Sequence, residues 1–319
     1  MPRTSPLSAP CCAPQAEPLV LPAPAKLNRL LHITGRRPDG YHELQTLFQF
    51  LDAGDTLTLR RRTDGELHLS PSLDGVASED NLILRAARLL QAETGRRLGA
   101  DIHLDKRLPM GGGLGGGSSD AATALLGLDA LWGLGLELTE LARLGLALGA
   151  DVPVFVHGHA AWAEGIGERL TPVTLDTPWF LVIHPGVTVS TPAVFGAPEL
   201  TRHTPPITMA RALQGGAASW RNDCQDTVRR HYPEVARALD WLAHRAPAML
   251  TGTGACVFAR LETESQADRL LAEVPEGWHA IKARGLNRSP LHAALGRCPS
   301  PPPGVETCPT CRRGADPGA

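Results

Sequence analysis

Residues 108–126 read LPMGGGLGGGSSDAATALL and place six glycines within seven positions, between a strand-like and a helix-like segment. Glycine lets the backbone adopt positive φ and lets a ligand approach the main chain closely. We expect the following helix to start near Ser118 with a serine cap, so its first N–H groups have no intrahelical partners and, with the helix dipole, favour an anion. The stretch therefore predicts a phosphate-binding loop, to which the hydroxyls of Ser118 and Ser119 contribute.

Two common glycine motifs do not fit this loop. The letters from Gly111 to Gly116 satisfy G-x-G-x-x-G, but a dinucleotide-binding fold carries that motif in its first βαβ unit, with an acidic residue about 20 positions later. Here the motif follows about 110 residues, and Asp129 lies inside the predicted helix. A Walker loop needs a lysine after its last glycine, where Ser118 stands. A positive charge must therefore come from elsewhere, and the candidates are Lys26 and Lys106.

Composition excludes several functional classes. The chain has 319 residues, a formal net charge of −2, 43% hydrophobic and 20% charged residues, which is typical of a globular protein of two domains. It shows no basic excess for nucleic acid or an anionic membrane, no apolar run near the ~20 residues of a membrane span, and no secretory signal. We therefore expect a cytoplasmic protein with a small-molecule substrate, and oligomeric state is left open.

The cysteines also suit a cytoplasmic protein. Seven cysteines, an odd number without a secretion signal, argue against a disulfide framework. A zinc site built from Cys298, Cys308 and Cys311 would need a fourth ligand from Cys11 or Cys12, so we favour free thiols and predict no structural metal site.

Strand-like and helix-like segments alternate through the body of the chain, which predicts an α/β or α+β protein of two layers. We expect disordered tails over residues 1–20 and 297–319, where Pro and small residues dominate. An N-terminal ATP-binding domain is expected over 21–168 and a C-terminal domain over 169–296. The predicted helices cover 81–95 (capped by Ser78 or Asp80 and ended by Gly95), 118–135, 140–150, 233–247 and 264–275, and the predicted strands 56–62, 66–70, 101–109, 152–165, 179–187 and 255–261.

Four further segments carry candidate chemistry. Lys26 and Asn28 share one face of a strand by its period of two. Tyr41 and His42 follow the turn RPDG, as part of a surface hairpin or as a platform for a base. Asp151 is a turn residue or a buried base. TGTG at 251–254 is a tight turn before a strand or part of a site. His157 and His159 would share a strand face, but no third ligand is suitably spaced, which disfavours a metal site.

The motif PMGGGLGGGSSDAA resembles the phosphate loop of the GHMP kinases, and PAPAKLN, RPDGYHELQT, SEDNLI, LGADVPVF and LTGTGACVFA extend the resemblance from about Pro22 to about Leu295. The resemblance implies a two-domain fold with the active site in the inter-domain cleft. It also implies ATP-dependent phosphorylation of a tertiary hydroxyl on a cytidine diphosphate ester of methylerythritol, in the non-mevalonate route to isoprenoids, with Mg²⁺ carried by ATP.

The resemblance also assigns residues. Lys26 and Asp151 match a catalytic pair, in which Asp151 accepts the hydroxyl proton and Lys26 stabilises its carboxylate and the transferring phosphoryl group. The cytidyl-substrate pocket is matched by Asn28, Tyr41, His42, Thr191 and Phe195. The nucleotide site is matched by Asn81, Lys106, Pro109, Met110, Gly111, Gly112, Gly113, Leu114, Gly115, Gly116, Gly117, Ser118 and Ser119.

Three alternatives differ in what they require. Another GHMP kinase, acting on homoserine or mevalonate, would not need the aromatic residue of the GYH segment, since its substrate has no base. A non-catalytic nucleotide or sugar sensor could lose Lys26 or Asp151, yet both are present. A nicotinamide dehydrogenase would carry its glycine loop near the start of the fold.

Overall fold

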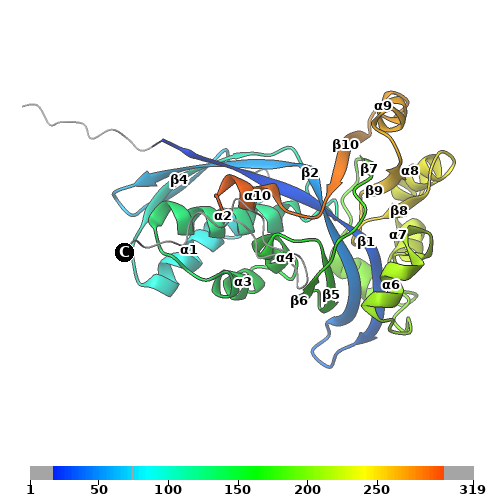
Figure 1. The fold of residues 1–319 in the computed structure, drawn as a ribbon, viewed down its shortest axis with the longest axis horizontal. Helices are drawn as coiled ribbons and strands as arrows, with labels where there is room; N and C mark the ends of the chain where they lie inside the picture. Colours follow the sequence, from blue (N-terminus) through cyan, green and yellow to red (C-terminus); the bar gives the residue numbers. More distant parts are fainter. Residues whose placement is uncertain (1–16, 74, 298–319) are drawn as a thin grey trace, which may run out of the picture.

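The computed structural model describes residues 17–73 and 75–297, which form an α+β fold (Figure 1). Almost all of the two predicted tails, and the cysteines they contain, lie outside the described residues. Strand β1 begins at Leu19, so it includes the last two residues of the predicted N-terminal tail. The boundary between domains at residues 168 and 169 stays a prediction. No helix in 17–73 or 75–297 is long and apolar enough to cross a membrane.

Two long antiparallel strands form the centre of the molecule. Strands β1 (Leu19–Arg36) and β2 (His42–Arg62) pair over nearly their whole length, with three register shifts. The turn between them contains Gly40, whose φ of 91° suits glycine. Strand β2 also pairs with β4 (Gly99–Asp105), β5 (Ala161–Gly165) and β10 (His279–Leu286). This ribbon therefore connects the N-terminal and C-terminal parts of one sheet.

The rest of the ten-stranded sheet extends on both sides of this ribbon. Strand β3 (Leu67–Ser70) is parallel to β4, and β6 (Arg169–Pro172) pairs with β5. The C-terminal part runs from β10 through β7 (Trp179–His184) and β9 (Val257–Leu261) to β8 (Ala248–Leu250). The strands predicted at 66–70 and 179–187 are thus confirmed within three residues, whereas the strand predicted at 56–62 is only the last part of β2, which begins 14 residues earlier, at His42.

Helices cover the N-terminal sheet on one face, as Figure 1 shows. They are α1 (Leu82–Thr94), α2 (Gly116–Trp132), α3 (Leu138–Leu146) and α4 (Val152–His157). Helix α2 is the central one, and most of its residues are buried in the core that it forms with β1, β2 and β4. This placement explains why apolar residues occur all around α2 from Ala121 to Trp132, since a helix surrounded by protein has no solvent-exposed polar face.

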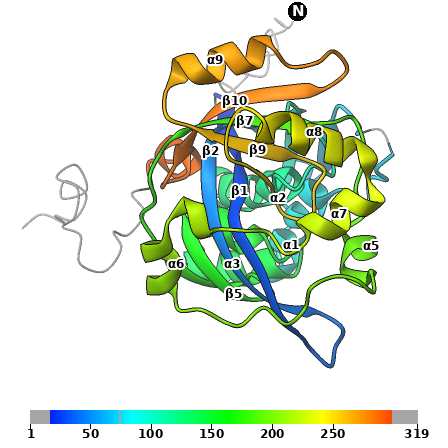
Figure 2. The ribbon, with the colours of Figure 1, turned by 90° about the vertical axis from the view of Figure 1, so that its right-hand side faces the viewer.

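The C-terminal part has its own core. Helices α8 (Pro233–Ala243) and α9 (Glu264–Ala272) pack against β7, β8 and β9, and α7 (Gln225–His231) packs on α8 (Figure 2). The connecting segment contains α5 (Thr191–Gly196), α6 (Met209–Gly215) and a 3₁₀ turn, η1 (Ala217–Ser219). Helix α10 (Pro290–Ala294) returns to the N-terminal core through the buried Leu291.

Three local predictions were wrong. Helix α1 is capped by Asn81, whose Oδ1 accepts from the N–H of Ile83 at 2.9 Å, and not by Ser78 or Asp80. Helix α2 starts at Gly116 after a left-handed Gly115, so no serine caps it. The segment predicted as a strand from residue 152 is helix α4 up to His157, because its β-branched residues are buried on all sides and Pro153 suits a first helical turn. His157 and His159 consequently share no strand face.

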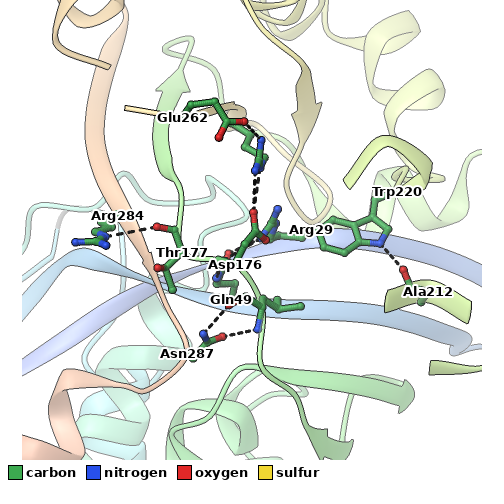
Figure 3. Close-up of polar contacts among 11 residues, drawn as sticks. Arg29, Gln49, Asp176, Thr177, Ala212, Trp220, Glu262, Arg284 and Asn287 are labelled. Atoms are coloured by element: carbon green, nitrogen blue, oxygen red, sulfur yellow. Dashed lines mark hydrogen bonds and ion pairs between the residues drawn. The ribbon is translucent and has the colours of Figure 1, made fainter. Parts of the chain in front are cut away.

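A buried polar network joins the two parts of the sheet, as Figure 3 shows. Arg29 on β1 is 2% exposed, and its guanidinium donates to Gln49 at 3.0 Å and to the Asp176 carboxylate at 2.6 Å. Arg260 on β9 binds the other carboxylate oxygen of Asp176 at 3.1 Å. The Arg29 guanidinium also lies over the ring of Trp220, at 4.5 Å from its centroid. These contacts make the ribbon part of a fixed junction rather than of a hinge.

Candidate active site

The glycine loop between β4 and α2 is held by its carbonyl groups. The carbonyls of Gly111 and Gly112 accept from the N–H groups of Ala255 and Cys256, at 3.1 and 3.0 Å. The carbonyl of Gly113 accepts from the Lys26 ammonium at 3.2 Å, and that of Leu114 from the Lys26 N–H at 2.9 Å. Because its acceptors are engaged by β1 and by the turn after β8, the loop is fixed with its donors available.

Those donors are arranged as the predicted anion site requires. Within the described part of the chain, no N–H group of residues 111–118 donates to a protein acceptor, and the first helical bond of this region runs from Ser119 to Gly115 at 2.8 Å. Glycines at 113 and 115 have φ of 74° and 71°. A Cβ on Gly113 would lie 2.3 Å from the Thr251 carbonyl oxygen. The close approach of the two loops therefore requires glycine here.

Lys26 and Asp151 meet beside this loop. The Lys26 ammonium is 2% exposed and lies 3.1 Å from an Asp151 carboxylate oxygen, while it donates to Asn28 Oδ1 at 2.5 Å. This last contact confirms that Lys26 and Asn28 share a face of β1. Asp151 occupies the cap position of α4 but makes no capping bond there. Its side chain, one third exposed, is thus directed to the ammonium and the cavity and not to its own helix.

Lys106 has an environment that the sequence alone did not predict. Its ammonium donates to Asp55 at 2.6 Å and to Asp120 at 2.8 Å, and both carboxylates are buried. Burial opposes the charged form of Lys106, but the two carboxylates outweigh it and raise its pKa. Burial also raises the pKa of Asp120 to about 7, an effect that Asp55 reinforces and Lys106 opposes. Lys106 is therefore anchored at the edge of the loop and is not a freely moving cation.

A second cavity of about 470 Å³ lies at the turn end of the β1–β2 ribbon. Tyr41, 60% exposed, and His42, 7% exposed, line it together with Thr191 and Phe195. The rings of His42 and Phe195 stack with centroids 5.0 Å apart and planes inclined by 21°. An aromatic pocket with a polar edge suits a planar base. Thr191, whose hydroxyl lies 2.8 Å from that of Thr253, connects this pocket to the main cavity.

The main cavity has a volume of about 560 Å³ and brings nearly all predicted residues together. It shares Leu44, Ala150, Ile166, Thr191 and Phe195 with the second cavity, so the two cavities adjoin. The predicted residues that line it are Lys26, Asn28, Asn81, Lys106, Pro109, Met110, Gly111, Gly112, Gly113, Leu114, Gly115, Gly116, Gly117, Ser118, Asp151, Thr191 and Phe195.

Ser119 is the exception among the predicted residues. It is fully buried inside α2 and does not line either cavity, so its hydroxyl is not available to a ligand there. Sequence reasoning also left the role of the 251–254 turn open and missed Asp55 and Asp120. Thr251 accepts from the N–H of Asn28 at 3.0 Å, and Gly252 and Thr253 line the main cavity. The TGTG pattern was the available signal for the turn, and the SSDAA end of the glycine motif was the available signal for Asp120, whereas nothing marked Asp55.

Comparison with known proteins agrees with this geometry. The N-terminal domain signature of GHMP kinases matches residues 81–159, and the C-terminal signature of GHMP kinases matches residues 207–280. A crystal structure of mevalonate kinase has a TM-score of 0.64 and 15% identity over 85% of this chain and 100% of its own, which shows a common fold. The glycine loop, the paired lysine and aspartate and the fold place this chain among the GHMP kinases.

Relatives at higher identity narrow the class. The 4-diphosphocytidyl-2-C-methyl-D-erythritol kinase of Chromohalobacter salexigens is 70% identical over 87% of this chain and 94% of its own, and that of Ectopseudomonas mendocina 60% identical over 87% and 94%. A crystal structure of 4-(cytidine 5'-diphospho)-2C-methyl-D-erythritol kinase has a TM-score of 0.73 and 34% identity, over 83% and 98%. The chain belongs to the 4-diphosphocytidyl-2-C-methyl-D-erythritol kinase family.

Proposed function

We propose that this enzyme transfers the γ-phosphoryl group of ATP to the tertiary 2-hydroxyl of 4-diphosphocytidyl-2-C-methyl-D-erythritol, a step of the non-mevalonate isoprenoid pathway that takes place in the cytoplasm, where ATP is available. The observation that carries the proposal is that the two cavities adjoin through shared lining residues. One end offers an aromatic pocket at Tyr41, His42 and Phe195, and the other a phosphate loop beside the Lys26–Asp151 pair. A substrate with a base at one end and a hydroxyl at the other fits this arrangement.

Different polar groups of the main cavity bind the ATP phosphates, accept the hydroxyl proton and stabilise the developing charge. Phosphoryl transfer depends mainly on positioning and charge neutralisation. The free N–H groups of residues 111–118 hold the phosphates of ATP, with Asn81 and Lys106 at the nucleotide side. Asp151 accepts the proton of the substrate hydroxyl as the new P–O bond forms. Lys26, 3.1 Å away, stabilises the carboxylate and faces the transferring group.

Magnesium fits this site as a companion of ATP. The part of the chain that the structure describes holds no cluster of three His, Cys, Asp or Glu side chains that could cage a metal ion. Mg²⁺ usually retains waters and binds through substrate phosphates and one or two carboxylates. Asp151 and the hydroxyl of Ser118 line the cavity and are the protein groups that would complete its shell. Bound there, the ion would neutralise charge on the phosphates.

Turnover against a panel of substrates tests the proposal. The cytidyl diphosphate ester of methylerythritol should be phosphorylated, whereas homoserine and mevalonate should not. Preference for either of these would point to another kinase of the same fold, and binding of ATP without turnover of any alcohol would point to a sensor.

The roles of the pair are tested by Asp151→Asn. The variant should lower kcat by ~10²–10⁴, the usual range for a positioned base, while ATP binding measured by calorimetry changes little. Asp240→Asn on the surface of α8, a carboxylate outside both cavities, serves as the matched control. Wild-type turnover in Asp151→Asn would remove Asp151 from the mechanism.

A further inference from the structure

Arg202 is a half-buried arginine that no sequence motif singles out, yet it binds both walls of the aromatic pocket. Its Nε donates to Nε2 of His42 at 3.1 Å. One terminal nitrogen donates to the carbonyls of Phe195 and Ala197, at 2.8 and 2.7 Å, and the other to the carbonyl of Leu200 at 3.1 Å. A single planar group thus fixes the orientation of His42 relative to the helix that carries Phe195.

This contact defines the hydrogen-bonding state of the His42 ring. An arginine Nε–H is always a donor, since guanidinium keeps its proton in proteins. The partner nitrogen, Nε2 of His42, must therefore be an acceptor, and the ring is the neutral form with its proton on Nδ1. Burial, Arg202 and Arg36 together lower the pKa of His42, which agrees with a neutral ring at pH 7.

The second ring nitrogen is left for a ligand. Across residues 17–73 and 75–297, Nδ1 of His42 has no hydrogen-bond partner, although the ring is only 7% exposed and lines the 470 Å³ cavity. Because this N–H is accessible from the cavity and no described residue accepts from it, a ligand that brings an acceptor to it gains a hydrogen bond within a mostly enclosed pocket. On the Watson–Crick edge, N3 of cytosine is an acceptor, whereas N3 of uracil carries a hydrogen and is a donor.

We propose that Arg202 is a positioning residue that sets the base preference of this enzyme: by occupying Nε2 of His42 it makes Nδ1–H the donor of the ring, which suits cytosine and opposes uracil. The inference rests on the proposed function and adds to it the residue that controls the polarity of the base pocket. Stacking on Tyr41 or Phe195 tolerates any base, so the hydrogen bond has to discriminate.

Arg202→Ala and Arg202→Gln test the proposal. Both remove the obligatory donor, so His42 can also carry its proton on Nε2 and present a lone pair at Nδ1. The ratio of kcat/KM for the cytidyl over the uridyl diphosphate ester should fall by about 10-fold or more, equivalent to about 1.4 kcal/mol. The KM for ATP should not change. Arg211→Ala on α6, outside both cavities, is the matched control and should keep the wild-type ratio.

A second measurement tests the effect of Arg202 on the His42 ring directly, without relying on enzyme turnover or on the stability of the variant. Nitrogen-15 NMR of His42 in the wild-type protein should show the neutral ring protonated on Nδ1 at pH 7. In Arg202→Gln the pKa of His42 should rise towards its ordinary value and the two neutral forms should mix. An unchanged base ratio in a cooperatively melting Arg202→Gln, or a wild-type ring protonated on Nε2, would overturn the proposal. If the wild type phosphorylates neither ester, the proposed function fails. The NMR spectrum then still shows whether Arg202 keeps the proton of His42 on Nδ1.

Discussion

Gly115→Ala tests whether the glycine loop holds Lys26, the proposed partner of Asp151, in place. Gly115 caps α2 with φ of 71° and ψ of 18°, and Gly133 ends the same helix with φ of 63° and ψ of 47°. Alanine in this left-handed conformation costs ~1–2 kcal/mol at either position. The surroundings differ, because a Cβ at 115 lies 2.9 Å from Phe155 Cζ and 3.0 Å from Lys26 Cε, whereas nothing lies within 4 Å of a Cβ at 133.

The expected effect on catalysis follows from the contact distance. Carbon atoms pack at ~3.5–4.0 Å, so the Lys26 methylene has to move by about 0.5–1 Å. A misplacement of ~1 Å at a reacting centre can reduce the rate by ~10². We expect Gly115→Ala to lower kcat by about 10- to 100-fold. Both variants should lose a similar ~1–2 kcal/mol to the backbone conformation, with overpacking adding ~1–3 kcal/mol at 115 only.

Steady-state kinetics and thermal unfolding of the two variants provide the assay. Gly133→Ala should melt at a lower temperature than the wild type but keep its kcat, since its Cβ meets no atom of the site. Equal kcat in the two variants would show that the loop does not restrain Lys26, and the reasoning from these contacts would be refuted.

Other predictions follow from single contacts. The raised pKa of Asp120, about 7 against the ordinary 3.8, means that between these values the folded protein holds a proton that the unfolded chain has lost. Wild-type unfolding free energy measured in urea should therefore fall with rising pH across this window by ~1.4 kcal/mol per unit relative to Asp120→Asn, and parallel curves would contradict the raised pKa. Tyr41→Ala should raise KM for the cytidyl ester about 10-fold or more, as a lost stacking face implies, and leave KM for ATP unchanged; the reverse pattern would put Tyr41 on the nucleotide side. Arg29→Met should destabilise the fold by ~1–3 kcal/mol in chemical denaturation because it leaves the buried Oε1 of Gln49 without its donor, whereas Asp176, 44% exposed, keeps Arg260; unchanged or higher stability would show that burial of the guanidinium costs as much as its contacts contribute. A chain of residues 17–297 should keep the full kcat, because among the described residues both cavities are lined by positions 26–253, well inside that range, and a substantial loss would give the trimmed segments a role.

Local patterns predicted the site well where the chemistry is contiguous in sequence. The run from Pro109 to Ser118 lines the cavity as a unit, and alternation along β1 placed Lys26 and Asn28 on one face. The same patterns misassigned α4, because an apolar run of valines suits a buried helix as well as a strand. Ser119 was included since it follows Ser118, but one step along a helix turned its side chain into the core.

Long-range pairing could not be read from the sequence. Asp55 lies 51 positions from Lys106, and Arg202 lies 160 positions from His42. Neither Asp55 nor Arg202 belongs to a motif, and each acquires its role only when β2 or the segment after α5 comes beside its partner. The acceptor state of His42 Nε2 is a property of that tertiary contact alone.

The paired strands β1 and β2 also fix the distance between the aromatic pocket and the Lys26–Asp151 pair. Phe48 lies opposite Asn28 in the register, six positions from His42 along β2. At ~3.3–3.4 Å per residue, the six positions from His42 to Phe48 correspond to ~20 Å along the ribbon, which is the separation between the aromatic pocket and the level of Asn28 and Lys26. Both faces of the ribbon are buried over residues 23–33 and 45–51, and a slip by one residue would exchange the side chains of the two faces, so this span cannot adjust gradually. Under the proposed function, an ester with one phosphate fewer could fill the base pocket or present its hydroxyl to Asp151, but could not do both at once.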